Sequence, residues 1–252
     1  MTHRVAVLGN SVPILIVPPR PTREEGTFPE RLQRLLDERG LDVEVRNESR
    51  LFDVLPDGWR RFQQQVIPWS PDVLVVNYGV IEMQPNVVPT WLNRHLTTET
   101  VGGKGPVALY KRRVVPKLWP PVRELQRWSS GKVGTRTWRL PPQRLGAELR
   151  RVIEVARKEQ MLVLVNDVHA PGDRLRHFFP AIERRHAIVQ QVLADTVDAL
   201  HDPDVRLVPV SQVSAKLGEV EGLPDGLHLT SAGHLGVAEL LADEIAPWLA
   251  GR

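Results

Sequence analysis

Five short apolar runs, separated by helical patterns, constrain the fold of this chain more than any other feature of its sequence. The runs are rich in Val and Leu, a composition typical of strands buried in a parallel sheet. They span Arg4–Leu8, Asp42–Arg46, Asp72–Tyr78, Met161–Asn166 and Val205–Val208. Strands that alternate with helices through right-handed crossovers form a parallel sheet with helices on both faces. The sequence therefore predicts an α/β fold, a three-layer α/β/α sandwich with a five-stranded parallel sheet.

The helical patterns between the runs complete this architecture. The clearest ones span Glu30–Arg39, Gly146–Glu159, Ala181–His201 and about Ser231–Leu249. We predict the doubly wound, flavodoxin-like strand order 2-1-3-4-5 for the sheet. A length of 252 residues suits a single large α/β domain that spans residues 1–252.

One stretch, from about residue 96 to residue 142, interrupts the alternation and is too long for an ordinary connection. It contains several prolines and the tryptophans Trp119, Trp128 and Trp138. Between Lys104 and Arg144 there are eleven basic residues and one acidic residue, a local charge of +10. The rest of the chain, with 22 basic and 29 acidic residues, carries −7. We interpret the stretch as a basic insertion over the site. Substrate binding, a solvated lid and a partner or oligomer interface are open alternatives for it.

Composition excludes several classes of chemistry. Because the chain contains no cysteine, it has no disulfide, no thiolate nucleophile and no Cys-based zinc site. The apolar stretch after Met1 is too short for a signal sequence or a membrane span, so we expect a cytoplasmic protein with no membrane partner. A net charge of +3 is weak support for nucleic acid binding. No nucleic-acid motif accompanies the basic cluster, so this partner is not expected.

The carboxyl ends of the strands are where a sheet of this kind binds its ligand. Ser11 directly follows the first strand at this edge, where a turn can expose its hydroxyl. By itself, a strand followed by Gly-Asn-Ser is more typical of a plain turn than of a nucleophile. Because the chain has no G-x-G-x-x-G sequence and no lysine-containing phosphate loop, the usual nucleotide sites are absent.

The segment from Pro224 to His234 is more informative, because it places Asp225 and His228 three residues apart ahead of a helix. One loop can then carry both side chains. The aspartate can hold the imidazole in one tautomer while the other ring nitrogen takes a serine proton. The alternative is structural, with Asp225 closing a turn, Thr230 or Ser231 capping the helix and His228 packing beside it.

Together the two ends of the chain resemble the SGNH/GDSL hydrolase family. The nucleophile of that family lies in a Gly-Asp-Ser block near the amino terminus, and an Asp-x-x-His block lies near the carboxyl terminus. Here the blocks read Gly9-Asn10-Ser11 and Asp225-Gly226-Leu227-His228. The strand-helix rhythm between them also matches the family fold, so the resemblance covers the chain outside the insertion.

This resemblance implies a catalytic triad. Ser11 would attack an acyl carbonyl, His228 would act as general base and then as general acid, and Asp225 would orient His228. The backbone N–H of Ser11 would bind the oxyanion. The resemblance implies no cofactor and no metal.

The internal blocks of the family are only partly matched. In place of Gly-x-Asn-Asp the chain reads Gly79-Val80-Ile81-Glu82, so the glycine is kept, Ile81 replaces the asparagine and Glu82 replaces the aspartate. No second-block glycine is found around Asn47 to Arg50. Loss of one oxyanion donor typically lowers turnover by about 10²- to 10³-fold. Asn77 and Asn10 are candidates for a substitute amide donor, and a structural role for Asn77 is an equal alternative.

The loop after the fourth strand emerges at the same edge of the sheet. Asn166 and His169 in this loop are candidates for substrate contact. Asp167 and His169 alone do not make a metal site, because two ligands on a loop are poor evidence for one.

These observations predict a serine esterase or deacylase that cleaves the O-acyl ester of a small molecule, such as a sugar-bearing or anionic metabolite. An acyltransferase with the same triad is one alternative, because a lid that excludes water favours transfer. A non-catalytic SGNH-like binding module is another, motivated by the degraded oxyanion blocks. A nucleic-acid-associated domain that uses the basic insertion is the third. The oligomeric state is not predicted.

Overall fold

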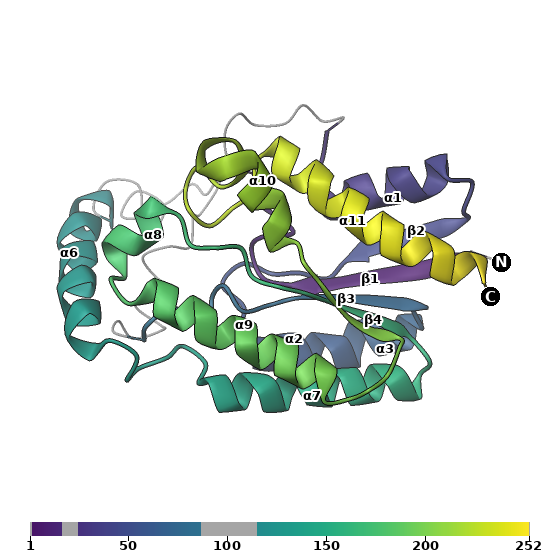
Figure 1. Cartoon of the computed structure of the whole chain (residues 1–252), viewed down its shortest axis with the longest axis horizontal. Helices are drawn as coiled ribbons and strands as arrows, with labels where there is room; N and C mark the ends of the chain where they lie inside the picture. The colour runs from purple at the N-terminus through teal and green to yellow at the C-terminus, as the bar shows by residue number, and fades with distance from the viewer. Residues whose placement is uncertain (1, 17–24, 87–114, 252) are drawn as a thin grey trace, which may run out of the picture.

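The five predicted apolar runs form the central sheet (Figure 1), where each strand buries at least one Val side chain. In this computed structural model the strands are β1 (His3–Gly9), β2 (Val43–Asn47), β3 (Val73–Asn77), β4 (Leu162–Asn166) and β5 (Val205–Val208). All neighbouring strands are parallel, in the order β2-β1-β3-β4-β5. The predicted fold class and strand order are confirmed. The structure describes residues 2–16, 25–86 and 115–251.

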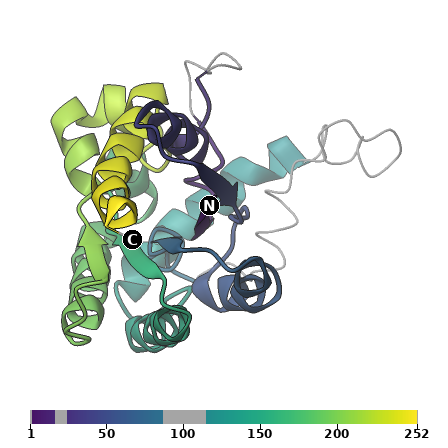
Figure 2. The same ribbon diagram turned by 90° about the vertical axis from the view of Figure 1, so that its right-hand side faces the viewer.

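Helices cover both faces of this sheet, and Figure 2 shows the same layers from the amino-terminal end of the strands. One layer contains α1 (Phe28–Glu38), α10 (Ser211–Gly222) and α11 (Ser231–Ala250). The other contains α2 (Leu55–Arg61), the π-helical η1 (Phe62–Val66), α3 (Ile67–Trp69), α7 (Pro142–Lys158) and α9 (Ile182–Asp198).

The four predicted helices form with small shifts at their ends. α1 begins before Glu30 because the carboxylate of Glu30 accepts a hydrogen bond from the Thr27 N–H (2.5 Å), which caps the helix. α7 begins at Pro142, since proline is favoured in the first turn of a helix. α9 ends before His201, whose φ of +50° is left-handed.

The predicted insertion is only partly described, because residues 96–114 lie outside the described residues. Its second half forms α6 (Val115–Val133), which stands with α8 (Asp173–Phe178) beyond the carboxyl ends of the strands (Figure 1). The Ser130 hydroxyl donates to the Phe178 carbonyl (3.0 Å) and joins the two helices. Trp138 packs against the core, with the Arg185 guanidinium 4.6 Å from its ring.

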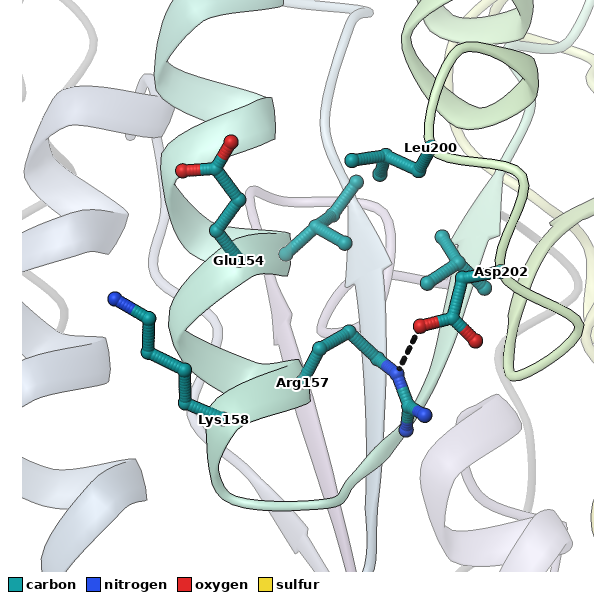
Figure 3. Close-up of a pocket in the computed structure, with 7 residues that line it drawn as sticks. Glu154, Arg157, Lys158, Leu200 and Asp202 are labelled. Carbon is teal, nitrogen blue, oxygen red and sulfur yellow. Dashed lines mark hydrogen bonds and ion pairs between the residues drawn. The ribbon is translucent and has the colours of Figure 1, made fainter.

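A pocket of about 340 Å³ lies at the opposite end of the molecule, between the end of α7 and the start of β5 (Figure 3). Arg157 crosses it and donates to Asp202 (2.7 Å), Asp204 (2.8 Å) and the Met161 carbonyl (2.5 Å). No hydroxyl or imidazole group lines the pocket. Because its arginine is already paired within the protein, we interpret the pocket as structural.

A buried arginine ties the loop after β2 to the loop after β3. Arg61 donates to the Glu48 carbonyl (2.8 Å), to the Tyr78 hydroxyl (3.1 Å) and to the Asp53 carboxylate. Arg61 and Asp53 are both buried. Removal of one partner from a buried ion pair strongly destabilises the folded protein, because the other charge stays buried without compensation.

We therefore expect Arg61→Met to lower the free energy of unfolding by about 3–5 kcal/mol in urea denaturation. Adding Asp53→Asn should recover part of this loss, because the buried charge is removed. Arg206→Met is the matched control, since Arg206 pairs with Glu244 on the surface and the pair contributes at most about 1 kcal/mol. Equal losses in Arg61→Met and Arg206→Met would contradict the assignment.

Candidate active site

Ser11 lies in a tight turn directly after the central strand β1. The turn begins at Gly9, where a Cβ would lie only 3.0 Å from the Asn77 carbonyl oxygen and from Pro13. Asn10 Oδ1 accepts a hydrogen bond from the Val12 N–H (3.2 Å), and the Ser11 carbonyl accepts from the chain that follows. These contacts hold Ser11 at 4% exposure. Glycine at position 9 therefore allows β1 to pack closely on β3 just before Ser11.

A second loop, between α10 and α11, carries Asp225 and His228. Gly226 in this loop has a φ of +76°, which favours glycine. It lies against Gly172, where a Cβ would come within 2.6 Å of the Gly226 Cα. Thr230 then caps α11 by accepting a hydrogen bond from the Gly233 N–H (3.2 Å). The loop is thus held from the β4 side and at the start of α11.

The structure brings Ser11, His228 and Asp225 together in one chain of hydrogen bonds. His228 Nε2 lies 2.9 Å from Ser11 Oγ, and His228 Nδ1 lies 2.8 Å from Asp225 Oδ2. The other oxygen of Asp225 accepts from the backbone N–H groups of Leu227 (2.9 Å) and His228 (2.7 Å). The acid therefore orients both its own loop and the imidazole.

The charge state of Asp225 suits this arrangement. Burial alone would raise the pKa of Asp225. The hydrogen bond and charge of His228, together with the two backbone N–H groups, lower it more, so the pKa lies below its ordinary value. An ionised Asp225 accepts the proton of His228 Nδ1. Nε2 is then left as the acceptor for the Ser11 hydroxyl, which is the arrangement needed to activate a serine.

Comparison with known proteins identifies solved structures with a similar fold. No protein-family model and no curated protein matches the sequence. The structure matches a lipase/acylhydrolase from Enterococcus faecalis with a TM-score of 0.64 and 13% identity, over 96% of this chain and 95% of that chain. It matches a GDSL-like lipase from Bacteroides thetaiotaomicron with a TM-score of 0.55 and 14% identity, over 97% and 88%. It matches an acetyl xylan esterase with a TM-score of 0.56 and 16% identity, over 96% and 99%.

The chain has the SGNH/GDSL hydrolase fold. This confirms the fold expected from the two terminal blocks.

Amide groups gather at the carboxyl edge of this SGNH fold. Asn10 follows β1, Asn77 ends β3 and Asn166 ends β4. Asn166 Nδ2 donates to Asn77 Oδ1 (3.0 Å), which orients the Asn77 amide. Asn10 Nδ2 and Asn166 Oδ1 are buried without a partner. Among the described residues, neither Asn77 Nδ2 nor the Ser11 N–H makes a hydrogen bond. Two donors at this edge of the sheet are thus left without a partner among the described residues.

Gly79 and Glu82, which the sequence predicts to line the oxyanion or substrate site, bond to each other. Glu82 is fully buried, and its two oxygens accept hydrogen bonds from the Gly79 N–H (2.7 Å) and the Leu55 N–H (2.9 Å). The N–H of Gly79 is thus used within the protein. Gly79 has a φ of +122° and no room for a Cβ beside Val168. Glu82 therefore braces the end of β3 against the start of α2.

The loop after β2 supplies no oxyanion donor from residues 48–50. The N–H groups of Glu48, Ser49 and Arg50 donate to the Val7 carbonyl, to Asn47 Oδ1 and to the Gly9 carbonyl. These backbone groups hold the loop against the Ser11 turn. The absence of a second-block glycine from the sequence thus agrees with a purely structural use of this stretch.

His169, which the sequence predicts to contact the substrate, bonds to α10 through Nδ1, and its Nε2 has no hydrogen-bond partner among the described residues. It is 6% exposed, and its Nδ1 lies 3.0 Å from Ser214 Oγ on α10. Burial, with smaller effects from His234 and His186, lowers the pKa of His169 to about 4. Asp167 in the same loop accepts hydrogen bonds from the N–H and hydroxyl of Ser211. The loop after β4 therefore fastens α10 to the sheet.

Within the described ranges there is no cluster of three or more His, Asp or Glu side chains that would hold a metal ion. None of the helices in those ranges is long and apolar enough to cross a membrane.

Sequence reasoning missed the buried ion pair between Arg61 and Asp53, which holds together the loops after β2 and β3. Arg61 stands in a run of polar residues, and the chain is rich in arginine. Nothing local distinguishes a buried arginine from the exposed ones. The only available signal is the spacing from Asp53, which is not specific.

Glu82 should make the stability of the protein depend on pH. Burial raises the pKa of Glu82 from 4.5 to about 7, although hydrogen bonds from the backbone and the charge of Arg139 oppose this rise. Between these values the unfolded chain has released a proton that the folded chain retains. The contribution of Glu82 is therefore full below about pH 4.5 and is lost as the pH rises to about 7.

We expect the free energy of unfolding of the native protein, relative to Glu82→Gln, to fall by roughly 3 kcal/mol between about pH 4 and pH 8. Urea denaturation at several pH values measures this difference. Glu154→Gln, on the exposed face of α7, is the matched control and should leave the pH dependence unchanged. A constant difference between native protein and Glu82→Gln would refute the shift.

Proposed function

We propose that this protein is a serine hydrolase that cleaves the O-acyl ester of a small molecule through an acyl-enzyme. The observation that carries the proposal is the continuous hydrogen-bond chain from Ser11 Oγ through His228 to Asp225. Its location at the carboxyl edge of an SGNH sheet adds support, because ligands bind at this edge in open α/β sheets. The esterases and acylhydrolases among the similar structures agree with it.

The proposed reaction has two halves. Ser11 Oγ attacks the ester carbonyl carbon while His228 Nε2 takes the hydroxyl proton. The tetrahedral intermediate collapses, the bond to the alcohol oxygen breaks, and His228 returns the proton to that oxygen. A water molecule then gives its proton to His228 and attacks the acyl-enzyme, and His228 protonates Ser11 as the acid leaves. Asp225 keeps the imidazole oriented throughout.

We assign the oxyanion to the Ser11 N–H and to Asn77 Nδ2. Both groups are free to donate, and Asn166 fixes the direction of the Asn77 amide. An amide on a neighbouring strand would thus replace the donor that is missing from the third block. Asn10 is a weaker candidate because its Nδ2 is fully buried.

A sugar-bearing ester is the favoured substrate class. One similar structure is an acetyl xylan esterase, which supports an acylated carbohydrate as a first choice for testing. A cytoplasmic location stays a prediction.

The first test compares hydrolysis of a panel of short-chain esters, including acetylated sugars, by the native protein and by Ser11→Ala. We expect serine-dependent turnover and covalent labelling of the native protein by a fluorophosphonate probe. Ser11→Ala and His228→Ala should lose similar activity, because triad residues act as a unit, whereas Asp225→Ala should lose less. Ser214→Ala, a serine bonded to His169 away from the chain of hydrogen bonds, is the control.

Equal turnover in the native protein and Ser11→Ala would exclude this mechanism. Absence of both turnover and labelling would favour a binding module with the SGNH fold.

The assignment of Asn77 has its own test. Asn77→Ala should lower kcat by about 10²- to 10³-fold with little change in KM, because the oxyanion forms only in the transition state. Asn77→Asp should lose at least as much, since it keeps the acceptor for Asn166 but replaces the donor with an oxygen. Asn10→Ala is the comparison variant. A larger loss in Asn10→Ala than in Asn77→Ala would transfer the role to Asn10.

A further inference from the structure

Exposed apolar side chains are confined to one end of the molecule. Among the described residues, the large hydrophobic side chains that are exposed are Leu15, Leu51, Leu125, Trp128, Val220 and Leu235. All six belong to segments at or beyond the carboxyl ends of the strands. The outer faces of α1, α7 and α9 contribute none to this set. An apolar surface restricted to one end is typical of an interaction site.

These side chains surround the segments that hold the serine site. Leu15 closes the Ser11 turn, with its N–H 2.9 Å from the Ser11 carbonyl. Leu51 follows Arg50, whose N–H donates to the Gly9 carbonyl (3.1 Å). Val220, 82% exposed, precedes the loop of Asp225 and His228, and Leu235 follows that loop in the first turn of α11. We call these four residues, with Leu125 and Trp128, the apolar rim.

Helix α6 contributes two large exposed side chains to the apolar rim. Leu125 and Trp128 are three residues apart and therefore share a face of the helix, where they are 57% and 58% exposed. Ser130 points the other way, toward α8. Lys132 lies beside Trp128, with Nζ 4.0 Å from the ring. An aromatic ring beside a lysine is typical of helices that lie at a membrane interface.

The charge of the segment that carries the α6 part of the apolar rim is strongly positive. Between residues 115 and 144 the sequence contains seven basic residues and one acidic residue, Glu124. Glu124 is already paired with Arg127 (2.7 Å), whereas Lys117, Lys132 and Arg136 are exposed. The partner of this surface should therefore carry negative charge and accept apolar side chains.

We propose that the apolar rim and the basic residues of α6 form a peripheral docking surface for an anionic lipid membrane. Leu125 and Trp128 enter the headgroup region while the basic side chains contact anionic headgroups. The side chains of the apolar rim come from five separate segments. A single bound acyl chain would contact fewer segments, so an extended surface is the better fit to the apolar rim. Docking itself does not depend on the proposed hydrolysis.

Co-sedimentation with lipid vesicles tests this proposal. The native protein should bind vesicles of phosphatidylcholine with about one third phosphatidylglycerol more strongly than vesicles of phosphatidylcholine alone, and added salt should weaken binding. Leu125→Ser combined with Trp128→Ser should weaken binding to the anionic vesicles at least tenfold, since two apolar side chains are lost from the interface. Both positions are exposed, so the thermal unfolding of the variant should match that of the native protein.

A charge-matched pair of variants separates docking from general attraction. Lys132→Glu on α6 and Lys158→Glu at the opposite end make the same change in net charge at exposed positions. Lys132→Glu should weaken vesicle binding several-fold, and Lys158→Glu should not. Equal effects of the two variants would overturn the assignment of this face.

Other outcomes would also overturn the proposal. The proposal fails if the native protein does not bind anionic vesicles. It also fails if the native protein binds neutral and anionic vesicles equally. Light scattering that shows a dimer in the native protein and a monomer in the Leu125→Ser and Trp128→Ser variant, with no vesicle binding, would assign the surface to a second copy. Ser11→Ala should bind vesicles like the native protein. The ester assay and the vesicle assay therefore test hydrolysis and docking independently.

Discussion

Burial of β1 at the centre of the parallel sheet is the constraint on which the rest of the structure depends. Its apolar residues Val5 to Leu8 are fully buried between β2 and β3, which fixes where the strand ends. The turn that follows can hold Ser11 only because Gly9 packs directly on Asn77. The hydrogen bond from Ser11 to His228 joins residues 217 positions apart, and the sheet brings these two ends of the chain together. The site is a consequence of strand order and close packing.

Buried polar contacts then hold the loops at that edge. Glu82 joins β3 to α2, Arg61 joins the loops after β2 and β3, and the loop after β4 is fastened to α10 through His169 and Asp167. These hydrogen bonds satisfy polar groups that would be unfavourable if they were left unpaired in the interior. Several polar residues on the loops at this edge therefore support the fold.

Among the described residues, a separation exists between the amino-terminal end of the sheet and the exposed large apolar side chains. The amino-terminal end of the sheet carries paired charges such as Arg157 with Asp202 and Asp204, whereas the exposed apolar side chains lie around the serine site. The basic excess of the insertion extends over the same end through α6. This separation relates the proposed chemistry to the proposed docking surface, because both use the carboxyl edge of the sheet.

The sequence alone determined the fold class, the strand order and the two terminal blocks, because apolar periodicity and the spacing of Asp225 and His228 are local patterns that tertiary contacts do not alter. It also predicted a site at the carboxyl edge of the sheet. Only the tertiary structure decided which partners the polar side chains there have. Glu82 and Gly79 bond to each other, and His169 bonds to α10, which their positions along the chain did not indicate. The partner of a buried polar group lies on another segment, and its identity depends on distances in space that sequence spacing does not contain.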